Sequence, residues 1–176
     1  MQHKHHIVFL TGAGISQESG ISTFRDANGL WNNHKIEEVA SPEGFEKNPQ
    51  LVLDFYNARR RQLDEVNPNE AHHLIAQLET KYNVTIITQN IDDLHERAGS
   101  TNVLHLHGEL RKCRSSKNPN LIYTCTQDIK LGDLASDGNQ LRPHIVWFGE
   151  AVTEIEKAIA ITQSADLFVI AGTSMV

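Results

Sequence analysis

The chain has 176 residues, of which 39% are hydrophobic, and this composition is typical of one soluble globular domain with room for a small inserted module. Its 16 basic and 22 acidic residues give a formal net charge of −6, so we expect no general attraction to nucleic acid or to an anionic membrane. No apolar run approaches the ~18 residues of a membrane span, and the polar start MQHKHH lacks the apolar core of a signal peptide. We therefore expect a cytoplasmic protein.

Five short apolar runs, each bounded by turn residues, are typical of buried parallel strands. They cover residues 7–10, 84–88, 103–106, 144–148 and 167–171. Helical patterns cover 50–65, 69–82 and 154–164. The second helix has Asn69 as its expected N-cap, and its apolar face is expected to carry Ala71, Leu74, Ile75 and Leu78. Alternating strands and helices predict an α/β fold that binds ligands at the carboxyl ends of its strands.

The first strand leads into a glycine-rich turn, TGAGISQESGISTFR, at residues 11–25. A turn of this kind before a helix offers backbone N–H groups that suit a pyrophosphate. Gly12 and Gly14 fit the dinucleotide fingerprint G-x-G-x-x-G, but Gln17 stands where the third glycine belongs. A conventional NAD(P) oxidoreductase is therefore disfavoured, and the turn alone is equally compatible with an ordinary tight turn.

Polar residues gather at the carboxyl ends of the next two strands. Strand 84–88 is followed by Gln89, Asn90, Asp92 and Asp93, with His95 beside them. Asn90 or Asp92 could simply cap the following helix, although capping does not explain the whole group. The strand at 103–106 runs into LHLHGEL, where alternation places His105 and His107 on one face, and an imidazole there can take a proton from a hydroxyl.

Seven ordered motifs resemble those of the sirtuins, the NAD-dependent protein-lysine deacylases. They are GAGIS, GISTFRD, GLW, TQNID, HLHG, LRPHIVWFGE and GTS, and the resemblance extends from residue 7 to residue 174. It implies one catalytic domain over 1–176, with a Rossmann-like parallel sheet that is truncated at its C-terminal end. The larger lobe is expected over about 1–26, 71–108 and 143–176, and a smaller inserted lobe over about 27–70 and 109–142.

The resemblance also implies that NAD is consumed by cleavage of its glycosidic bond, giving nicotinamide, O-acyl-ADP-ribose and the free lysine. His107 is then the general base on a ribose hydroxyl, with Asn90 and Asp92 as the other catalytic residues. The diphosphate would be held by Gly12, Ala13, Gly14 and Ser16, and the loop over the nicotinamide ribose would include Phe24, Arg25, Asp26 and Trp31. Further cofactor contacts are expected from Gln89, Asn90, Ile91, Asp92, Gly172, Thr173 and Ser174, although the last three could form only a turn.

Acylated lysine in a protein or peptide is the substrate that the resemblance implies. The segment Val146, Trp147, Phe148 and Gly149 would pair with the substrate backbone. Tyr56 and Arg59 stand three apart on a helix and so share a face; by themselves they suggest a core tyrosine and a solvated arginine. In the sirtuins that act on negatively charged acyl groups, a Tyr-x-x-Arg pair grips the acyl carboxylate. We therefore predict desuccinylase and demalonylase activity, leave deacetylation open, and expect Arg60 and Arg61 to be surface charges.

The chain departs from the sirtuin pattern in two places. Most sirtuins have two Cys-x-x-Cys pairs before LRPHIVWFGE, whereas this chain has only Cys113 and Cys125, so we predict no zinc and free thiols. A substitute core is expected from Leu121, Ile122, Tyr123, Ile129 and Leu131. The chain also ends directly after GTS, which leaves open a weakly active relative that only binds peptide or ADP-ribose. ADP-ribosyl transfer to protein is a third alternative, because it needs only a different nucleophile.

Overall fold

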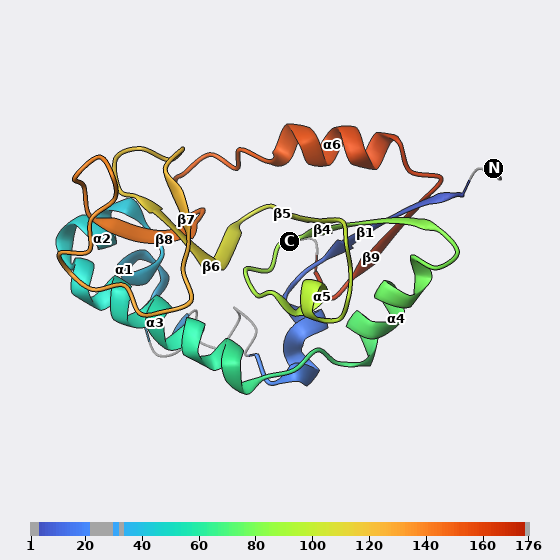
Figure 1. The fold of residues 1–176 in the computed structure, drawn as a ribbon, viewed down its shortest axis with the longest axis horizontal. Helices are drawn as coiled ribbons and strands as arrows, with labels where there is room; N and C mark the ends of the chain where they lie inside the picture. Colours follow the sequence, from blue (N-terminus) through green and yellow to red (C-terminus); the bar gives the residue numbers. More distant parts are fainter. Residues whose placement is uncertain (1–3, 22–29, 32–33, 175–176) are drawn as a thin grey trace. The chain divides into compact units, whose positions relative to one another are not determined.

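The computed structural model describes residues 4–21, 30–31 and 34–174 (Figure 1). The chain forms two compact units. Unit 1 comprises Met1–Thr23, Val66–His107 and Val152–Val176, and unit 2 comprises Phe24–Glu65 and Gly108–Ala151. Residues 143–151 thus fall in unit 2, whereas the sequence placed them in the larger lobe.

Unit 1 contains a four-stranded parallel sheet with the order β5-β4-β1-β9. The strands are β1 (His6–Thr11), β4 (Asn83–Thr88), β5 (Val103–His105) and β9 (Leu167–Ala171). In the central pairs Thr11 lies opposite Thr88 and opposite Ala171, so three strands end at the same level. This sheet confirms the predicted α/β fold, and it delivers the turns that follow these strands to one edge.

Both faces of this sheet are covered by apolar side chains, because alternate residues of a buried strand point to opposite faces. One cluster contains Ile7, Phe9, Ile15, Ile75, Val84 and Ile86; the other contains Val8, Ile87, Leu104, Leu106 and Ala158. The helix α4 (Glu70–Leu78) packs on the first face and α6 (Ile155–Gln163) on the second (Figure 1). The remaining helices of unit 1 are the short 3-10 helix η1 (Ala13–Ser19) and α5 (Leu94–Arg97).

The helix α4 begins where the sequence predicts, but a different set of side chains is buried. The Asn69 side chain accepts a hydrogen bond from the Ala71 N–H at 3.0 Å, which confirms the predicted N-cap. Leu74 is 52% exposed, whereas His72 is fully buried together with Ile75. The helix is therefore rotated relative to the expected apolar face, and a histidine takes the place of a leucine in the interior.

Unit 2 contains helices and a separate antiparallel sheet. Its helices are α1 (Ile36–Val39), α2 (Pro42–Lys47) and α3 (Pro49–Glu65), and its sheet has the order β7-β6-β8, with β6 (Gly108–Ser115), β7 (Ile122–Thr124) and β8 (Leu141–Ile145). A two-residue pair, β2 (Leu30–Trp31) and β3 (His34–Lys35), completes it. The prediction of a parallel strand at 144–148 is wrong: β8 ends at Ile145 and pairs antiparallel with β6. Pro143 fits this edge position because it cannot donate to a neighbouring strand.

The core of unit 2 includes both cysteines. Leu53, Cys113, Cys125 and Ile129 form the buried cluster, with Phe45, Tyr123 and Leu141 packed against it. Of the expected substitute core, Ile129 and Tyr123 take part, but Ile122 and Leu131 are 44% and 49% exposed. The core therefore forms around the two thiols.

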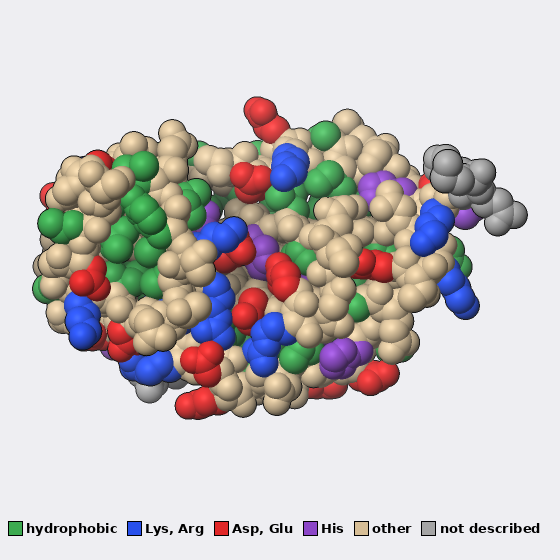
Figure 2. Space-filling model, in the orientation of Figure 1, with side chains coloured by type: hydrophobic (Ala, Val, Ile, Leu, Met, Phe, Trp, Pro, Cys, Tyr) green, Lys and Arg blue, Asp and Glu red, His purple; other side chains and the backbone are tan. Residues whose placement is uncertain are grey.

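Charged side chains of both signs are interspersed on the face of the molecule shown in Figure 2. Across the ranges that the structure describes, no helix has both the length and the apolar character needed to cross a bilayer.

Candidate active site

The turns after β1, β4 and β9 meet at the carboxyl edge of the parallel sheet. The Gly12 N–H donates to the Ala171 carbonyl at 3.2 Å, and the Gly14 N–H donates to the Gly172 carbonyl at 2.8 Å. The Thr173 hydroxyl donates to Gln89 Oε1 at 3.0 Å. Three segments that the sequence predicts for NAD binding are thus in direct contact.

Glycine is required in the first turn because the two neighbouring turns leave no room for a side chain. A Cβ atom at Gly12 would lie 2.7 Å from Thr173 Cβ, and one at Gly14 would lie 2.9 Å from the Gly172 carbonyl oxygen. The turn therefore suits a bound diphosphate, since the backbone itself forms the surface. The N–H groups of Gly12 and Gly14 already bond to the β9 turn, so these glycines act in this structure through close packing.

Asn90 and Asp92 belong to a buried hydrogen-bond network that holds η1 and the glycine turn before it. Asn90 Nδ2 donates to the Gly12 carbonyl at 3.2 Å and to the Ser16 hydroxyl at 3.1 Å, and Ser16 donates to Asp92 Oδ2 at 3.0 Å. The second oxygen of Asp92 accepts from the Leu94 N–H at 3.2 Å, a contact of the Asx-turn type, whereas the N-cap position of α5 is Asp93, whose side chain makes no capping bond. Burial raises the pKa of the Asp92 carboxyl above its ordinary value, and the bonds from Leu94 and Ser16 partly oppose this.

The two strand histidines have different partners. His105 bonds through Nδ1 to the Asn90 carbonyl at 2.9 Å and through Nε2 to Glu96 Oε1 at 2.8 Å, so both its nitrogens face structural oxygens. His107 bonds through Nδ1 to the Gln89 carbonyl at 2.9 Å. Because a carbonyl oxygen can only accept, Nδ1 of His107 is the donor in this contact, and in the neutral ring the lone pair then lies on Nε2. His107 is therefore in the tautomer that a general base needs.

The segment predicted to bind substrate is a turn in unit 2, and the ion pair between Arg142 and Glu150 holds it in place. Glu150 accepts from the Trp147 N–H at 2.8 Å and from Arg142 Nη1 at 2.7 Å, and the Arg142 guanidinium lies 3.2 Å from the centre of the Trp147 ring. Phe148 is 58% exposed, and its N–H donates to the Ala40 carbonyl at 2.9 Å. Val146 and Gly149 flank these residues outside any strand, and Gly149 has a φ of 87°. The fixed turn presents an exposed aromatic side chain.

Tyr56 and Arg59 lie together on α3 among aromatic rings. Tyr56 is fully buried, and its hydroxyl accepts from Trp147 Nε1 at 3.0 Å. Burial raises the pKa of Tyr56 above its usual range, so its O–H keeps its proton and remains a donor. The Arg59 guanidinium lies 4.5 Å from the centre of the Phe55 ring and 5.8 Å from that of Trp31.

The next arginine on α3 differs from its prediction. Arg60 is only 1% exposed, and it donates from Nε to the Leu110 carbonyl at 2.9 Å and from Nη1 to Asn57 Oδ1 at 2.7 Å. Arg61 is exposed and pairs with Asp128, as a surface charge should. The amide of Asn57 and a strand carbonyl provide the acceptors that allow Arg60 to be buried.

Three residues predicted for the cofactor loop, Phe24, Arg25 and Asp26, lie outside the described residues. Trp31 is described and packs edge-on against Phe55, with ring centres 4.8 Å apart. Ala13 and Ile91 are half-buried near the turns described above, and Ser174 is exposed. The sequence analysis gave no role to His72 or His95, although both are buried. For His72 the sequence did contain a signal, because a residue three positions before Ile75 shares its helix face.

The residues of unit 2 do not fit a structural zinc site. Such a site needs four Cys or His ligands, but Cys113 and Cys125 are surrounded by apolar side chains. No group of three or more His, Cys, Asp or Glu that could hold a metal occurs in the described part of the chain. The buried, positively charged guanidinium of Arg60 lies close enough to interact electrostatically with both thiols, so it would repel a metal cation bound there.

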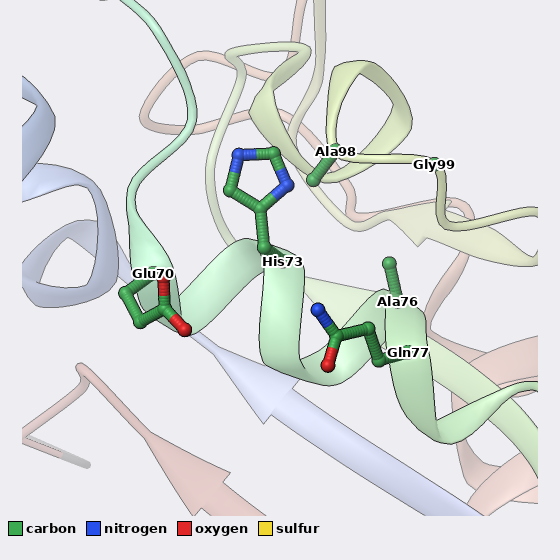
Figure 3. Close-up of a pocket in the computed structure, with 6 residues that line it drawn as sticks. All are labelled: Glu70, His73, Ala76, Gln77, Ala98 and Gly99. Atoms are coloured by element: carbon green, nitrogen blue, oxygen red, sulfur yellow. The ribbon is translucent and has the colours of Figure 1, made fainter.

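Two surface hollows can be placed in the part of unit 1 that the structure describes. One, of about 390 Å³, lies between α4 and α5 and is lined by Glu70, His73, Ala76, Gln77, Ala98 and Gly99 (Figure 3). None of these residues belongs to the predicted site. The other, of about 530 Å³, lies between α6 and the sheet and includes Gln89 and Thr173 from the carboxyl edge, with Leu10, Ile159 and Phe168 along its apolar wall.

A family model described as the Sir2 family matches residues 12–176, which include every one of these strand-end turns. The chain belongs to the Sir2 family. A Sir2 relative from Helicobacter pylori (strain ATCC 700392 / 26695), named NAD-dependent protein deacylase, is 64% identical over 170 residues, covering 97% of this chain and 74% of the relative. A protein of the same name from Bacteroides thetaiotaomicron is 58% identical over 176 residues, covering 97% of this chain and 75% of the relative.

Solved structures of Sir2 proteins have the same fold. A Sir2 homologue in complex with ADP-ribose superposes with a TM-score of 0.88 at 42% identity, covering 98% of this chain and 72% of that one. A Sir2 homologue in complex with NAD gives 0.86 at 43% identity, covering 98% of this chain and 70% of that one. This chain thus has the fold of Sir2 proteins whose solved structures contain ADP-ribose or NAD.

Proposed function

We propose that this Sir2 chain is an NAD-dependent protein deacylase that removes succinyl and malonyl groups from lysine side chains. The observation that carries the acyl preference is the placement of Tyr56 and Arg59 three residues apart on α3, near enough for each to act electrostatically on the other. A protonated phenol beside a guanidinium offers two donors to a carboxylate, which a neutral acetyl group does not possess.

The strand-end turns provide the NAD site. Gly12, Gly14 and Gly172 keep the turns close enough for their backbones to face a diphosphate, and Gln89 and Thr173 are bonded to each other at the same edge. Held at these turns, NAD would supply an electrophilic ribose carbon to the reaction. The residues present fit this cofactor, since a side chain at either of the first two glycines would fill the cradle.

His107 acts as the general base at Nε2. The Gln89 carbonyl fixes its tautomer through Nδ1, so the lone pair on Nε2 can accept the proton of a ribose hydroxyl. The same contact sets the orientation of the ring. Asn90 and Asp92 act beside it by holding η1, through Gly12 and Ser16, in the conformation described above.

Arg59 provides the charge that selects the acyl group. Its guanidinium lies over the Phe55 ring, a weakly polar neighbour, so an incoming carboxylate gains a strong charge-assisted bond. Trp31 lies edge-on to the Tyr56 ring, with centres 6.1 Å apart, and Tyr56 is fully buried. Binding of the acyl carboxylate at the Tyr56 hydroxyl therefore requires the surrounding aromatic side chains to move.

The decisive experiment compares succinyl-lysine and acetyl-lysine versions of one peptide, with NAD, using Arg59→Met. We expect kcat/KM for desuccinylation to fall about 30-fold to 1000-fold, the effect of losing one desolvated charge pair, while deacetylation changes less than about threefold. Arg61→Met is the matched control, because Arg61 is an exposed arginine of the same helix, and it should leave both rates unchanged. Mass spectrometry of the peptide and of O-acyl-ADP-ribose provides the readout.

Two outcomes would contradict the proposal. Equal losses for both peptides in Arg59→Met would assign Arg59 to structure instead of acyl selection. ADP-ribose binding by the wild-type chain without turnover of either peptide would favour the alternative of a binding-only relative. In the His107→Asn variant we expect loss of both activities with little change in stability, because among the described residues the His107 ring makes one hydrogen bond, to the Gln89 carbonyl.

A further inference from the structure

Two buried histidines of unit 1 have no part in the reaction described above. His72 in α4 and His95 in α5 are 0% and 1% exposed, and their rings pack with centres 4.8 Å apart and an interplanar angle of 62°. Burial lowers the pKa of each imidazole to about 4, so both rings are neutral at physiological pH. The helices that carry them lie side by side (Figure 1).

The two rings connect β1 to the start of α4. His95 Nε2 lies 3.0 Å from the hydroxyl of Thr11, the last residue of β1. At the other end, His72 Nδ1 accepts from the Asn69 backbone N–H at 3.3 Å. Thr11 is fully buried and Asn69 is half-buried, so these contacts are largely shielded from water.

Asn69 links this chain of contacts to the glycine turn. Its Oδ1 caps α4, while its Nδ2 donates to the Ile15 carbonyl at 2.8 Å and to the Ser19 hydroxyl at 3.0 Å. Ile15 and Ser19 both belong to η1, which follows the Gly12 turn. The Asn69 side chain thus holds the start of α4 through its oxygen and η1 through its nitrogen.

The helix η1 is therefore held from two sides. Asn90 and Asp92 bond to it through Ser16, and Asn69 bonds to it through Ile15 and Ser19. A 3-10 helix of this length has poorer internal hydrogen bonds than an α-helix, so its conformation depends on such outside contacts.

We propose that Asn69, His72 and His95 are positioning residues that set the affinity for NAD through η1 without contacting the cofactor. The packed, neutral rings hold α4 and α5 at a fixed separation, and Asn69 transmits this placement to the turn. The inference rests on the proposed function only in taking the η1 turn as the diphosphate site.

The variant Asn69→Ser tests this link because serine still caps a helix but lacks the amide nitrogen that reaches η1. The probe is ADP-ribose, with affinity measured by calorimetry, so that the result does not depend on turnover of any acyl peptide. We expect binding to weaken about five- to tenfold, the effect of losing one or two neutral hydrogen bonds. The KM for NAD should rise by the same factor, with kcat and the KM for peptide nearly unchanged.

Hydrogen exchange distinguishes positioning from general destabilisation. In Asn69→Ser we expect faster exchange concentrated in the amides of η1, with a fall in the urea midpoint no larger than that of the control variant Ser41→Ala. Ser41→Ala is the control for loss of a helix cap, since Ser41 accepts from the Gly44 N–H at 2.9 Å in unit 2 and does not touch η1. It should lower stability and leave ADP-ribose binding intact.

A second variant, Thr11→Val, removes only the hydroxyl that His95 contacts, and we expect it to weaken ADP-ribose binding about threefold or more. Unchanged affinity in Asn69→Ser would overturn the proposal, and so would a loss of affinity matched by Ser41→Ala. If the wild-type chain binds no ADP-ribose, the premise that η1 forms the diphosphate site is wrong. If it binds ADP-ribose but does not remove acyl groups, only the proposed function fails.

Discussion

At Gly172 the turn after β9 contacts η1, and the two segments can approach this closely only because residue 172 has no side chain. Its φ is 68°, in the left-handed region, and a Cβ atom there would lie 2.3 Å from the Ile15 backbone nitrogen. Both the backbone conformation and the available space therefore require glycine. The same contact holds the Gly14 N–H against the Gly172 carbonyl.

We predict that Gly172→Ala lowers the free energy of unfolding by about 3 kcal/mol or more, since it adds a backbone clash to the cost of a left-handed alanine. ADP-ribose binding should be lost with it, because the turns must separate. Gly99→Ala is the matched control in the same unit: Gly99 has a φ of 107°, but its Cβ would meet nothing closer than Ala76 Cβ at 4.0 Å. It should cost about 1–2 kcal/mol and leave binding unchanged. Equal costs in urea unfolding would contradict the role given to the contact.

At the scale of elements, the parallel strands and long helices could be predicted because their signals are local. The apolar runs at 84–88 and 167–171 coincide with β4 and β9, and the Asn69 cap marks the start of α4 within one residue. Strand-end placement also identified the residues that converge at the carboxyl edge. Polar residues directly after buried strands meet there by topology alone.

The elements that differed depend on partners distant in the sequence. The strand β8 has the composition of a buried strand, but its pairing with β6 could not be inferred from its own residues. In α4, periodicity favoured Leu74 over His72, and only Asn69 and His95 explain why an imidazole is buried there. Arg60 is a similar case, because its acceptor is the carbonyl of Leu110, 50 residues away.

The thiol-centred core of unit 2 leads to a prediction about metal. We expect less than about 0.1 zinc per folded chain by elemental analysis, and no change in Tm on adding EDTA, because the cluster offers only Cys113 and Cys125 as ligands. Contact with Cys113 lowers the pKa of Cys125 to about 7 and raises that of Cys113. Cys125→Ala should be destabilising through lost packing. Stoichiometric zinc that is lost with Cys125→Ala would overturn this prediction.

At the scale of the whole molecule, buried histidines determine how stability responds to mild acid. His72 and His95 titrate near 4 in the folded chain and near 6.5 when unfolded, so the unfolded chain binds more protons between these values. The contribution of these two histidines to the free energy of unfolding is therefore fully present above about pH 6.5 and is lost as the pH falls toward 4. Burial also lowers the pKa of His144 in unit 2, which acts in the same direction.

The carboxyls of Glu96 and Glu150 act below this window. The bond from His105 lowers the pKa of Glu96 and the bond from Arg142 lowers that of Glu150, in each case against burial, so these groups lose their contribution only as the pH falls below about 4.5. Asp92 has the opposite sign, because burial raises its pKa and favours its protonated form. As the pH falls from 7 to 5, His72 and His95 therefore lower the stability, and Asp92 opposes them.

We predict that the free energy of unfolding falls by roughly 3 kcal/mol between pH 7 and pH 5, about half of it from each buried ring of unit 1. Urea unfolding followed by far-UV circular dichroism reports both units, whereas fluorescence reports unit 2, where both tryptophans lie. A larger shift by dichroism would mean that unit 1 loses stability by itself, and equal shifts would mean that the units unfold together. His95→Gln should remove about half of the decrease, while His73→Gln, at an exposed position of α4, should leave it intact. Stability that is flat from pH 7 to pH 5 would show that the rings are not buried in the neutral form.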